Sequence, residues 1–258
     1  HVYNYEGGGV SFNSGVSCKL VDGHRGMITA KQVLESINPP DFYHSPLTSL
    51  VCLENTTNKG GGACYEMDEI IKIKKVCQEH NLGLHLDGAR LMNAIVANKE
   101  DTKHYGNVFD TISVCLSKGL GAPMGTVLIG NSSLMKNAIR VRKVLGGGMR
   151  QVGFMAAAGL YAMEHQVDRL EEDHQKAKQI ALHLESLSYI KKVEPTQTNI
   201  VIFYMQEGLN QEDFINALAA KNIRISDMGQ GKLRVVTHHD YTSKMHSVFL
   251  DTLTAYKH

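Results

Sequence analysis

The sequence predicts an α/β fold, in which a mostly parallel β-sheet carries helices on both faces, followed by a smaller α+β domain. Apolar runs alternate with segments of helical periodicity through the first 165 residues. Beyond them, a long helix with one polar face precedes short strands and helices. No Pro/Gly/Ser-rich linker separates the two parts. We therefore expect a large domain over residues 1–163 and a small domain over residues 164–258.

Strands alternate with helices in the large domain. Apolar runs predict strands over 47–54 (LTSLVCLE), 82–87 (LGLHLD), 111–117 (TISVCLS) and 125–130 (GTVLIG). Between the first two strands, the segment 67–81 repeats its apolar residues at helical spacing, and a short helix is expected after the second strand. Such alternation is typical of parallel strands that are joined by helices.

The small domain is predicted from a different pattern. It opens on an amphipathic helix over 168–187 (DRLEEDHQKAKQIALHLESL). The remaining expected elements are a strand over 199–205, a helix over 211–222, strands over 223–226 and 233–238, and a last helix from about Ser243.

Composition favours a small-molecule partner. The formal net charge is +1, from 27 Lys and Arg against 26 Asp and Glu, and no block of like charges is present. Neither a nucleic acid nor a membrane is therefore expected as a partner. No apolar run reaches the ~20 residues that a membrane-spanning helix needs.

The five cysteines predict a reducing compartment. They are odd in number and show no CxxC spacing, so we expect free thiols, no disulfide and a cytoplasmic location. The first residue is His1 rather than Met, and we expect the chain to be a fragment of a longer protein.

Two neighbouring strands of the predicted sheet end in charged residues. Asp87 closes one strand and is followed closely by Arg90, whereas Lys118 follows the next strand in SVCLSKGLGAPMG. A spacing of one βαβ unit brings both strand ends to the same edge of the sheet, where ligands of open α/β sheets bind. The sequence therefore predicts a pocket that contains a carboxylate, a guanidinium and an amine.

A lysine among small and apolar residues must reach water, find a partner, or lose its charge by reacting. Desolvation makes an amine nucleophilic, which is the usual setting of Schiff-base chemistry. Pyridoxal phosphate uses such a lysine together with an aspartate that keeps its ring nitrogen protonated. An ordinary surface ion pair explains Asp87 and Lys118 equally well on spacing alone.

Other ligand motifs are weak. GLGAPMG has GxGxxxG spacing rather than the GxGxxG of dinucleotide sites. His85 and Asp87 share a strand face, and His238 lies in HHD, but no third ligand stands at a diagnostic spacing. We expect no metal site.

Longer motifs carry a family resemblance over the whole chain. HLDGARLMNA, CLSKGLGAPMGTVLIG and RKVLGGGMRQVGFMAAAGLYAM closely resemble the low-specificity L-threonine aldolases. That family depends on pyridoxal phosphate and has the aspartate-aminotransferase fold, known as fold type I. SLVCLENTTNKGGG and LRVVTHHD occur in the family's order as well.

The resemblance implies roles for five residues near the cofactor and substrate. Lys118 resembles the lysine that holds the cofactor covalently, and Asp87 resembles the partner of its ring nitrogen. Arg90 and Arg234 are similar to the pair that grips the substrate carboxylate, for which planar guanidinium groups are suited. His1 resembles the histidine that stacks on the cofactor ring.

Two further residues complete the implied site, and two features depart from the family. His44 resembles a second histidine near the substrate hydroxyl, a candidate base, and Arg150 an arginine that reaches the cofactor phosphate from a neighbouring subunit. Thr57 stands where a histidine is usual, a change that we expect to be tolerated. Roughly the first 80 residues of the family, which carry its phosphate-binding loop, are absent.

The implied activity is aldol cleavage of L-threonine or L-allo-threonine to glycine and an aldehyde. The implied assembly is a homo-oligomer, a dimer of dimers. Three alternatives stay open: another fold type I lyase that carries out β-elimination, a metal-dependent hydrolase built on HLD, and a truncated subunit that binds cofactor without turnover.

Overall fold

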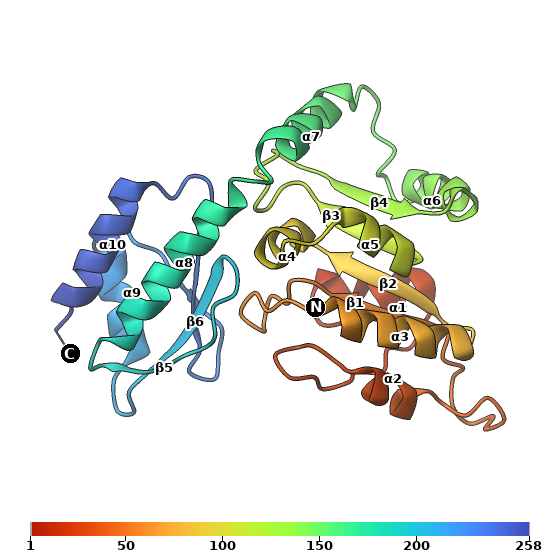
Figure 1. Cartoon of the computed structure of the whole chain (residues 1–258), viewed down its shortest axis with the longest axis horizontal. Helices are drawn as coiled ribbons and strands as arrows, with labels where there is room; N and C mark the ends of the chain where they lie inside the picture. The colour runs from red at the N-terminus through yellow and green to blue at the C-terminus, as the bar shows by residue number, and fades with distance from the viewer. Residues whose placement is uncertain (1, 258) are drawn as a thin grey trace.

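The computed structural model describes residues 2–257 and confirms the α/β class with mostly parallel strands. Strands β1 (Leu50–Glu54), β2 (Gly83–Gly88) and β3 (Thr111–Cys115) run parallel in that order (Figure 1). Strand β4 (Thr126–Gly130) pairs antiparallel with β3 at the edge of the sheet. The predicted strands therefore exist, although β1 begins three residues later than the apolar run.

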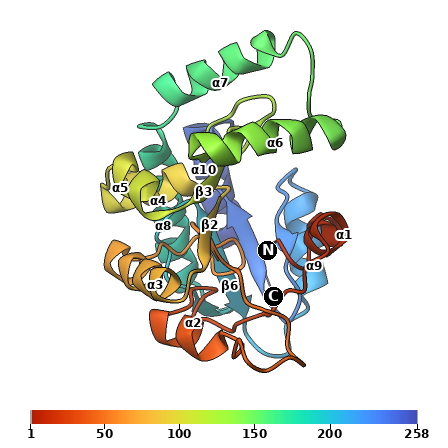
Figure 2. The same ribbon diagram turned by 90° about the vertical axis from the view of Figure 1, so that its right-hand side faces the viewer.

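Helices α2 (Ala30–Ser36), α3 (Met67–Glu79), α4 (Leu91–Asn98) and α5 (Thr102–Val108) accompany this sheet. Figure 2 shows α3, α4 and α5 on one side of the sheet, whereas the short helix α1 (Gly9–Ser14), which follows a turn of 3₁₀ helix over Glu6–Gly8, lies on the other. No residue of α1 is buried. The expected coverage of both faces is thus uneven within residues 2–257.

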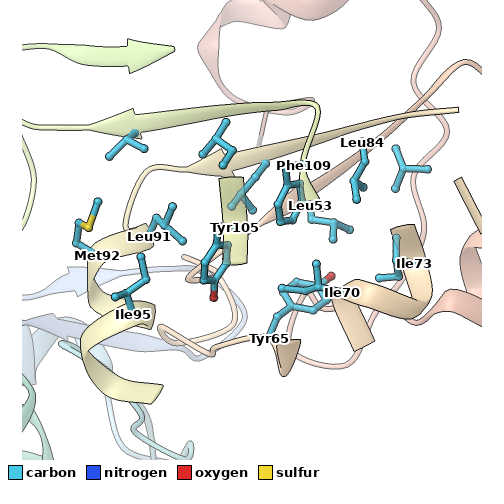
Figure 3. Packing of buried hydrophobic residues seen from close by; sticks show 14 of the residues in the cluster. Leu53, Tyr65, Ile70, Ile73, Leu84, Leu91, Met92, Ile95, Tyr105 and Phe109 are labelled. Carbon is cyan, nitrogen blue, oxygen red and sulfur yellow. The ribbon is translucent and has the colours of Figure 1, made fainter. Parts of the chain in front are cut away.

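Residue alternation along the strands explains this difference. Leu53, Leu84 and Ile112 point to the helix-covered face and are almost inaccessible to solvent. Positions on the other face, such as His85 and Asp87, are only partly covered. Figure 3 shows part of the core that results, together with the aromatic rings that complete it. Because side chains alternate along a strand, one face is apolar and the other polar.

The small unit forms a second core. An antiparallel sheet has the order β5-β6-β8-β7, with strands β5 (Ile190–Val193), β6 (Ile200–Met205), β7 (Ser226–Asp227) and β8 (Leu233–Val236). Helices α8 (Leu170–Glu185), α9 (Gln211–Ala219) and α10 (Ser243–Ala255) accompany it. The strand predicted over 223–226 is wrong in extent, because the chain reaches its pairing partner only at Ser226.

The two clusters of buried side chains support the predicted division into two domains. One cluster lies under β1–β3, and the other joins β6 and β8 to α8, α9 and α10. Leu170, at the start of α8, belongs to the first cluster, whereas Leu184, near its end, belongs to the second. We propose to keep the boundary between residues 163 and 164, which lies near the end of α7 (Gly153–His165).

The segment from β4 to α7 adds only Ala162 of α7 to the buried cores. Helices α6 (Ser132–Val144) and α7 extend beyond the sheet at the top of Figure 1. No residue of α6 or of β4 is buried. Within the described part of the chain, no helix is long and apolar enough to cross a bilayer.

Candidate active site

The carboxyl end of β2 fixes Asp87 at the expected edge of the sheet. Asp87 lies between Glu54 of β1 and Ser113 of β3 in the strand register. Its Oδ1 accepts a hydrogen bond from the backbone N–H of Ala89 at 3.1 Å. A side chain at Gly88 would collide with the Ser113 carbonyl oxygen, at 2.6 Å from an ideal Cβ. The tight turn after the strand therefore depends on glycine and holds the carboxylate in place.

Lys118 follows the neighbouring strand by three residues. Its Nζ lies 3.6 Å from Sγ of Cys115, the last residue of β3, and no ion pair joins it to a carboxylate of residues 2–257. The expectation of a desolvated lysine is wrong for this chain, because the side chain is exposed. Lys118 is nevertheless an amine without an ion pair among the described residues, just beyond the strand next to that of Asp87.

The glycines after Lys118 are required by close packing and backbone conformation within the protein. An ideal Cβ on Gly119 would lie 3.0 Å from Leu170 and 3.1 Å from Asn93. Gly121 adopts a φ of +72°, which side chains disfavour. The close neighbours of Gly119 are residues of α4 and α8. The loop after Lys118 is therefore anchored against both units.

Two arginines from different units approach each other at the same edge. Arg90 caps the start of α4, and Arg234 lies on β8. Burial lowers the pKa of Arg90, and the positive charge of Arg234 lowers it further. Burial also lowers the pKa of Arg234. Within residues 2–257, neither guanidinium forms a direct ion pair, although the carboxylates of Glu54 and Asp87 partly offset the charge of Arg90.

Asn58 orients Arg234 across the junction between the units. Its Oδ1 accepts a hydrogen bond from Nη1 of Arg234 at 2.9 Å. Nε of Arg234 is buried and has no hydrogen-bond partner within the described residues. A buried donor without a partner is costly, and a planar carboxylate satisfies such a fork with two parallel bonds. The arrangement can therefore hold a carboxylate.

The structure does not bring His44 to this edge. His44 lies on an exposed turn before β1, where its ring contacts Tyr43 at 3.9 Å between centroids. The turn precedes the first residue of β1, whereas Asp87 lies at the other end of the parallel strands (Figure 1). Within one chain, His44 and Asp87 therefore lie at opposite ends of the parallel strands.

Arg150 lies on an exposed turn between α6 and α7. His1 lies outside the described residues. Thr57, the expected tolerated change, is buried, and its hydroxyl donates to the carbonyl of Arg25 at 2.9 Å. A threonine is thus accommodated at this position without an unsatisfied hydroxyl.

Two residues of this edge were missed by sequence reasoning. Glu54 ends β1 next to Asp87, and burial raises the pKa of its carboxyl. The signal that indicated Asp87, a charged residue closing an apolar strand, applies to Glu54 as well. Asn58 carried no comparable signal, because its partner Arg234 is far away in the sequence.

The residues present fit pyridoxal phosphate. Asp87 offers a carboxylate with only one described hydrogen bond, Lys118 offers a primary amine without an ion pair, and the arginine pair offers donors for an amino-acid carboxylate. The unpartnered Nε of Arg234 is a buried donor that an anion would satisfy. An acid for the ring nitrogen, an amine and an anion site are the groups that this cofactor and its substrates require.

Comparisons with known proteins agree with this site. The model of the beta-eliminating lyase family matches residues 1–208. Low-specificity L-threonine aldolase 1 of Arabidopsis thaliana is 37% identical over 250 residues, which is 94% of this chain and 69% of that protein. The low specificity L-threonine aldolase of Escherichia coli K12 is 36% identical over 241 residues, which is 93% of this chain and 70% of that protein.

Solved structures share the fold. A putative L-allo-threonine aldolase of Listeria monocytogenes superposes with a TM-score of 0.82 at 21% identity, covering 98% of this chain and 72% of its own. The threonine aldolase of Leishmania major gives 0.82 at 20% identity, covering 98% and 74%. These likenesses show the fold of pyridoxal-phosphate enzymes of fold type I. With the sequence matches, they establish that the chain belongs to the beta-eliminating lyase family, among the low-specificity L-threonine aldolases.

Proposed function

We propose that the protein uses pyridoxal phosphate to cleave β-hydroxy-α-amino acids, namely L-threonine and L-allo-threonine, into glycine and an aldehyde. The observation that carries this proposal is the arginine pair at the carboxyl edge of the sheet, which lies close to the strand ends of Asp87 and Lys118. An amino-acid substrate requires a site for its own carboxylate beside the Lys118 amine and the Asp87 carboxylate.

Each group has a distinct task in this reaction. Arg90 and Arg234 bind the substrate carboxylate and so orient the bond that breaks. Asp87 keeps a proton on the ring nitrogen, an effect that is largest in the transition state. When bound, the cofactor supplies a ring that accepts electrons. The amine of Lys118 holds the cofactor and accepts or returns a proton beside it.

The proposed roles of the remaining residues require assembly. His44 is the proposed base for the β-hydroxyl and lies before the start of β1, whereas Asp87 ends β2. Arg150 is the proposed ligand of the cofactor phosphate and lies on an exposed turn between α6 and α7. We therefore keep the homo-oligomer, a dimer of dimers, as part of the proposal. Exposed apolar side chains on α6 and α7 support it, among them Val144 and Phe154. His1 keeps its proposed role as the residue stacked on the ring.

The five free cysteines support the proposed cytoplasmic location.

The test combines a spectrum with product analysis. The protein is incubated with pyridoxal phosphate, and the visible absorbance of lysine-bound cofactor is recorded before L-threonine and L-allo-threonine are added. We expect acetaldehyde and glycine in equal amounts. Lys118→Ala should abolish both the absorbance and the products, whereas Asp87→Asn should lower kcat far more than it changes KM.

Arg234→Gln supplies the complementary readout. It should raise KM roughly tenfold to a hundredfold, as expected for the loss of a hydrogen-bonded charge pair. Absorbance without cleavage points to a subunit that binds cofactor and does not turn over. Release of other products points to a β-eliminating lyase instead.

A further inference from the structure

A basic hollow of about 300 Å³ lies at the junction of the two units, and none of Asp87, Arg90, Lys118 and Arg234 lines it. We call it the junction hollow. Loop residues of the large unit form one wall, and strands of the small sheet form the other. The charged side chains that line it are those of Arg25, Lys59, Lys192, Glu194 and Lys232.

The alternation of the small sheet directs these side chains. Val201 and Phe203 of β6 are buried in the core that α8, α9 and α10 share with the sheet. Their neighbour Tyr204 points the other way, into the junction hollow, and its cross-strand partner Lys192 lines it too. Lys232 directly precedes β8 and lines the junction hollow as well. The face without helices thus carries the basic residues.

Positive charge is in excess in the junction hollow. Glu194 forms an ion pair with Lys192 at 2.7 Å. It is the one carboxylate among five charged side chains that line the hollow, and the other four are cations. Arg25 donates from Nε to the carbonyl of Gly60 at 2.9 Å and from Nη2 to that of Pro195 at 2.6 Å. These acceptors are uncharged, so the one carboxylate of the hollow, Glu194, is shared between Lys192 and Arg25.

The two remaining lysines lack an anion. Lys59 lies over the ring of Tyr5, 4.9 Å from its centroid, and is exposed. Lys232 forms no ion pair with any of residues 2–257. One lysine therefore belongs to the large unit and the other to the small unit, and both line the same hollow.

We propose that the junction hollow binds a small phosphate-bearing polyanion, at a site separate from the carboxylate site of Arg90 and Arg234. Lysine ammonium groups act as mobile point charges and suit phosphate oxygens, whereas the paired guanidinium groups suit a planar carboxylate. A ligand held by Lys59 and Lys232 touches both units, so its binding stabilises their contact. The proposed aldol cleavage does not require this site, and binding at the site does not require that the protein be catalytically active.

The test is a calorimetric titration with pyrophosphate. The protein is first saturated with pyridoxal phosphate, so that the cofactor's own phosphate site is filled, and ionic strength is held constant with NaCl. We expect saturable binding of one pyrophosphate per chain. The double variant Lys59→Gln/Lys232→Gln should weaken it by roughly tenfold or more, as expected for lost charge-assisted hydrogen bonds.

Two further variants control for charge and folding. Lys191→Gln removes a positive charge from the same sheet, but this lysine is exposed and paired with Glu207 at 2.5 Å outside the junction hollow. It should bind pyrophosphate as the parent protein does. Lys59→Arg/Lys232→Arg keeps both charges and should retain most of the affinity.

Three outcomes overturn the proposal. They are the absence of saturable binding at constant ionic strength, an unchanged affinity in a folded Lys59→Gln/Lys232→Gln protein, and equal weakening by Lys191→Gln. The last outcome indicates diffuse surface charge. To separate pyrophosphate from an organic source of the same group, the titration is repeated with a sugar phosphate, and tighter binding of the latter identifies a phosphorylated metabolite.

Discussion

Helices α7 and α8 follow each other in the chain but differ in how they are packed. The α7 sequence, GFMAAAGLYAMEH, has a single acidic residue, yet only Gly159 and Ala162 are buried. The α8 sequence, LEEDHQKAKQIALHLE, is rich in charge, yet seven of its residues are buried. Burial within this chain therefore follows the presence of an amphipathic stripe, not the total apolar content.

An apolar helix whose apolar residues are not confined to one face needs packing partners on several sides. Phe154 is 81% exposed and Leu160 is 63% exposed, on a helix whose described neighbours cover only the face around Gly159. Exposed apolar surface of this kind marks an interface. A second copy of the chain, or the part of a full-length relative that this chain does not span, is able to cover it.

The largest expected effect comes from a matched pair of leucines. Leu184 of α8 is completely buried, whereas Leu160 of α7 is mostly exposed. Leu184→Ala should lower the free energy of unfolding by about 2–5 kcal/mol, because it leaves a cavity in the small core. Leu160→Ala should change it by less than about 0.5 kcal/mol in the dissociated chain. Urea denaturation at low protein concentration measures both, and equal losses would contradict the comparison.

The second expected effect concerns pH. His174 of α8 is buried against Asn93, with Nε2 and Oδ1 3.0 Å apart, and burial lowers its pKa to about 4. In the unfolded chain a histidine has a pKa near 6.5. Between these values the unfolded state takes up a proton that the folded state does not bind. The free energy of unfolding should therefore fall by about 1–3 kcal/mol as pH decreases from about 6.5 to 4.

The control for this pH effect is His165 of α7, which is exposed. Denaturation curves at several pH values should show that His174→Gln flattens the dependence across this window, whereas His165→Gln leaves it unchanged. A slope that survives His174→Gln would assign the effect to other groups.

The smallest expected effect concerns assembly. Phe154→Ser on α7 should weaken self-association by roughly tenfold, as expected for the loss of one apolar interface side chain. Leu182→Ser on α8 removes a side chain of similar exposure, 66%, from the packed helix and should leave association unchanged. Analytical ultracentrifugation over a range of concentrations decides. An unaltered association constant for Phe154→Ser would remove α7 from the interface.

Much of the fold could be predicted because its signals are local. The parallel strands show as apolar runs, and α8 shows as a stripe of residues spaced by three and four. The strand over 223–226 was misplaced because the register of β7 is set by β8. Helices α6 and α7 were not among the predicted elements.

Some residues of the candidate site could likewise be predicted from local sequence signals, and others could not. Asp87 and Lys118 were predictable, because each follows an apolar strand and parallel strands end at one edge. The exposure of Lys118 was not, since it depends on which distant segments cover the loop. The position of His44 was also out of reach, because a family resemblance assigns a role without saying whether one chain supplies the residue.

By itself the sequence determined the order of the elements, the polarity of each strand and the carboxylate and amine at two strand ends, because these follow from residue periodicity and chain direction. Only the tertiary structure decided that Arg90 approaches Arg234, that Asn58 orients the latter, and that Lys59 and Lys232 line one hollow. Contacts between residues so far apart in the chain depend on how the two units pack, and no local pattern encodes that packing.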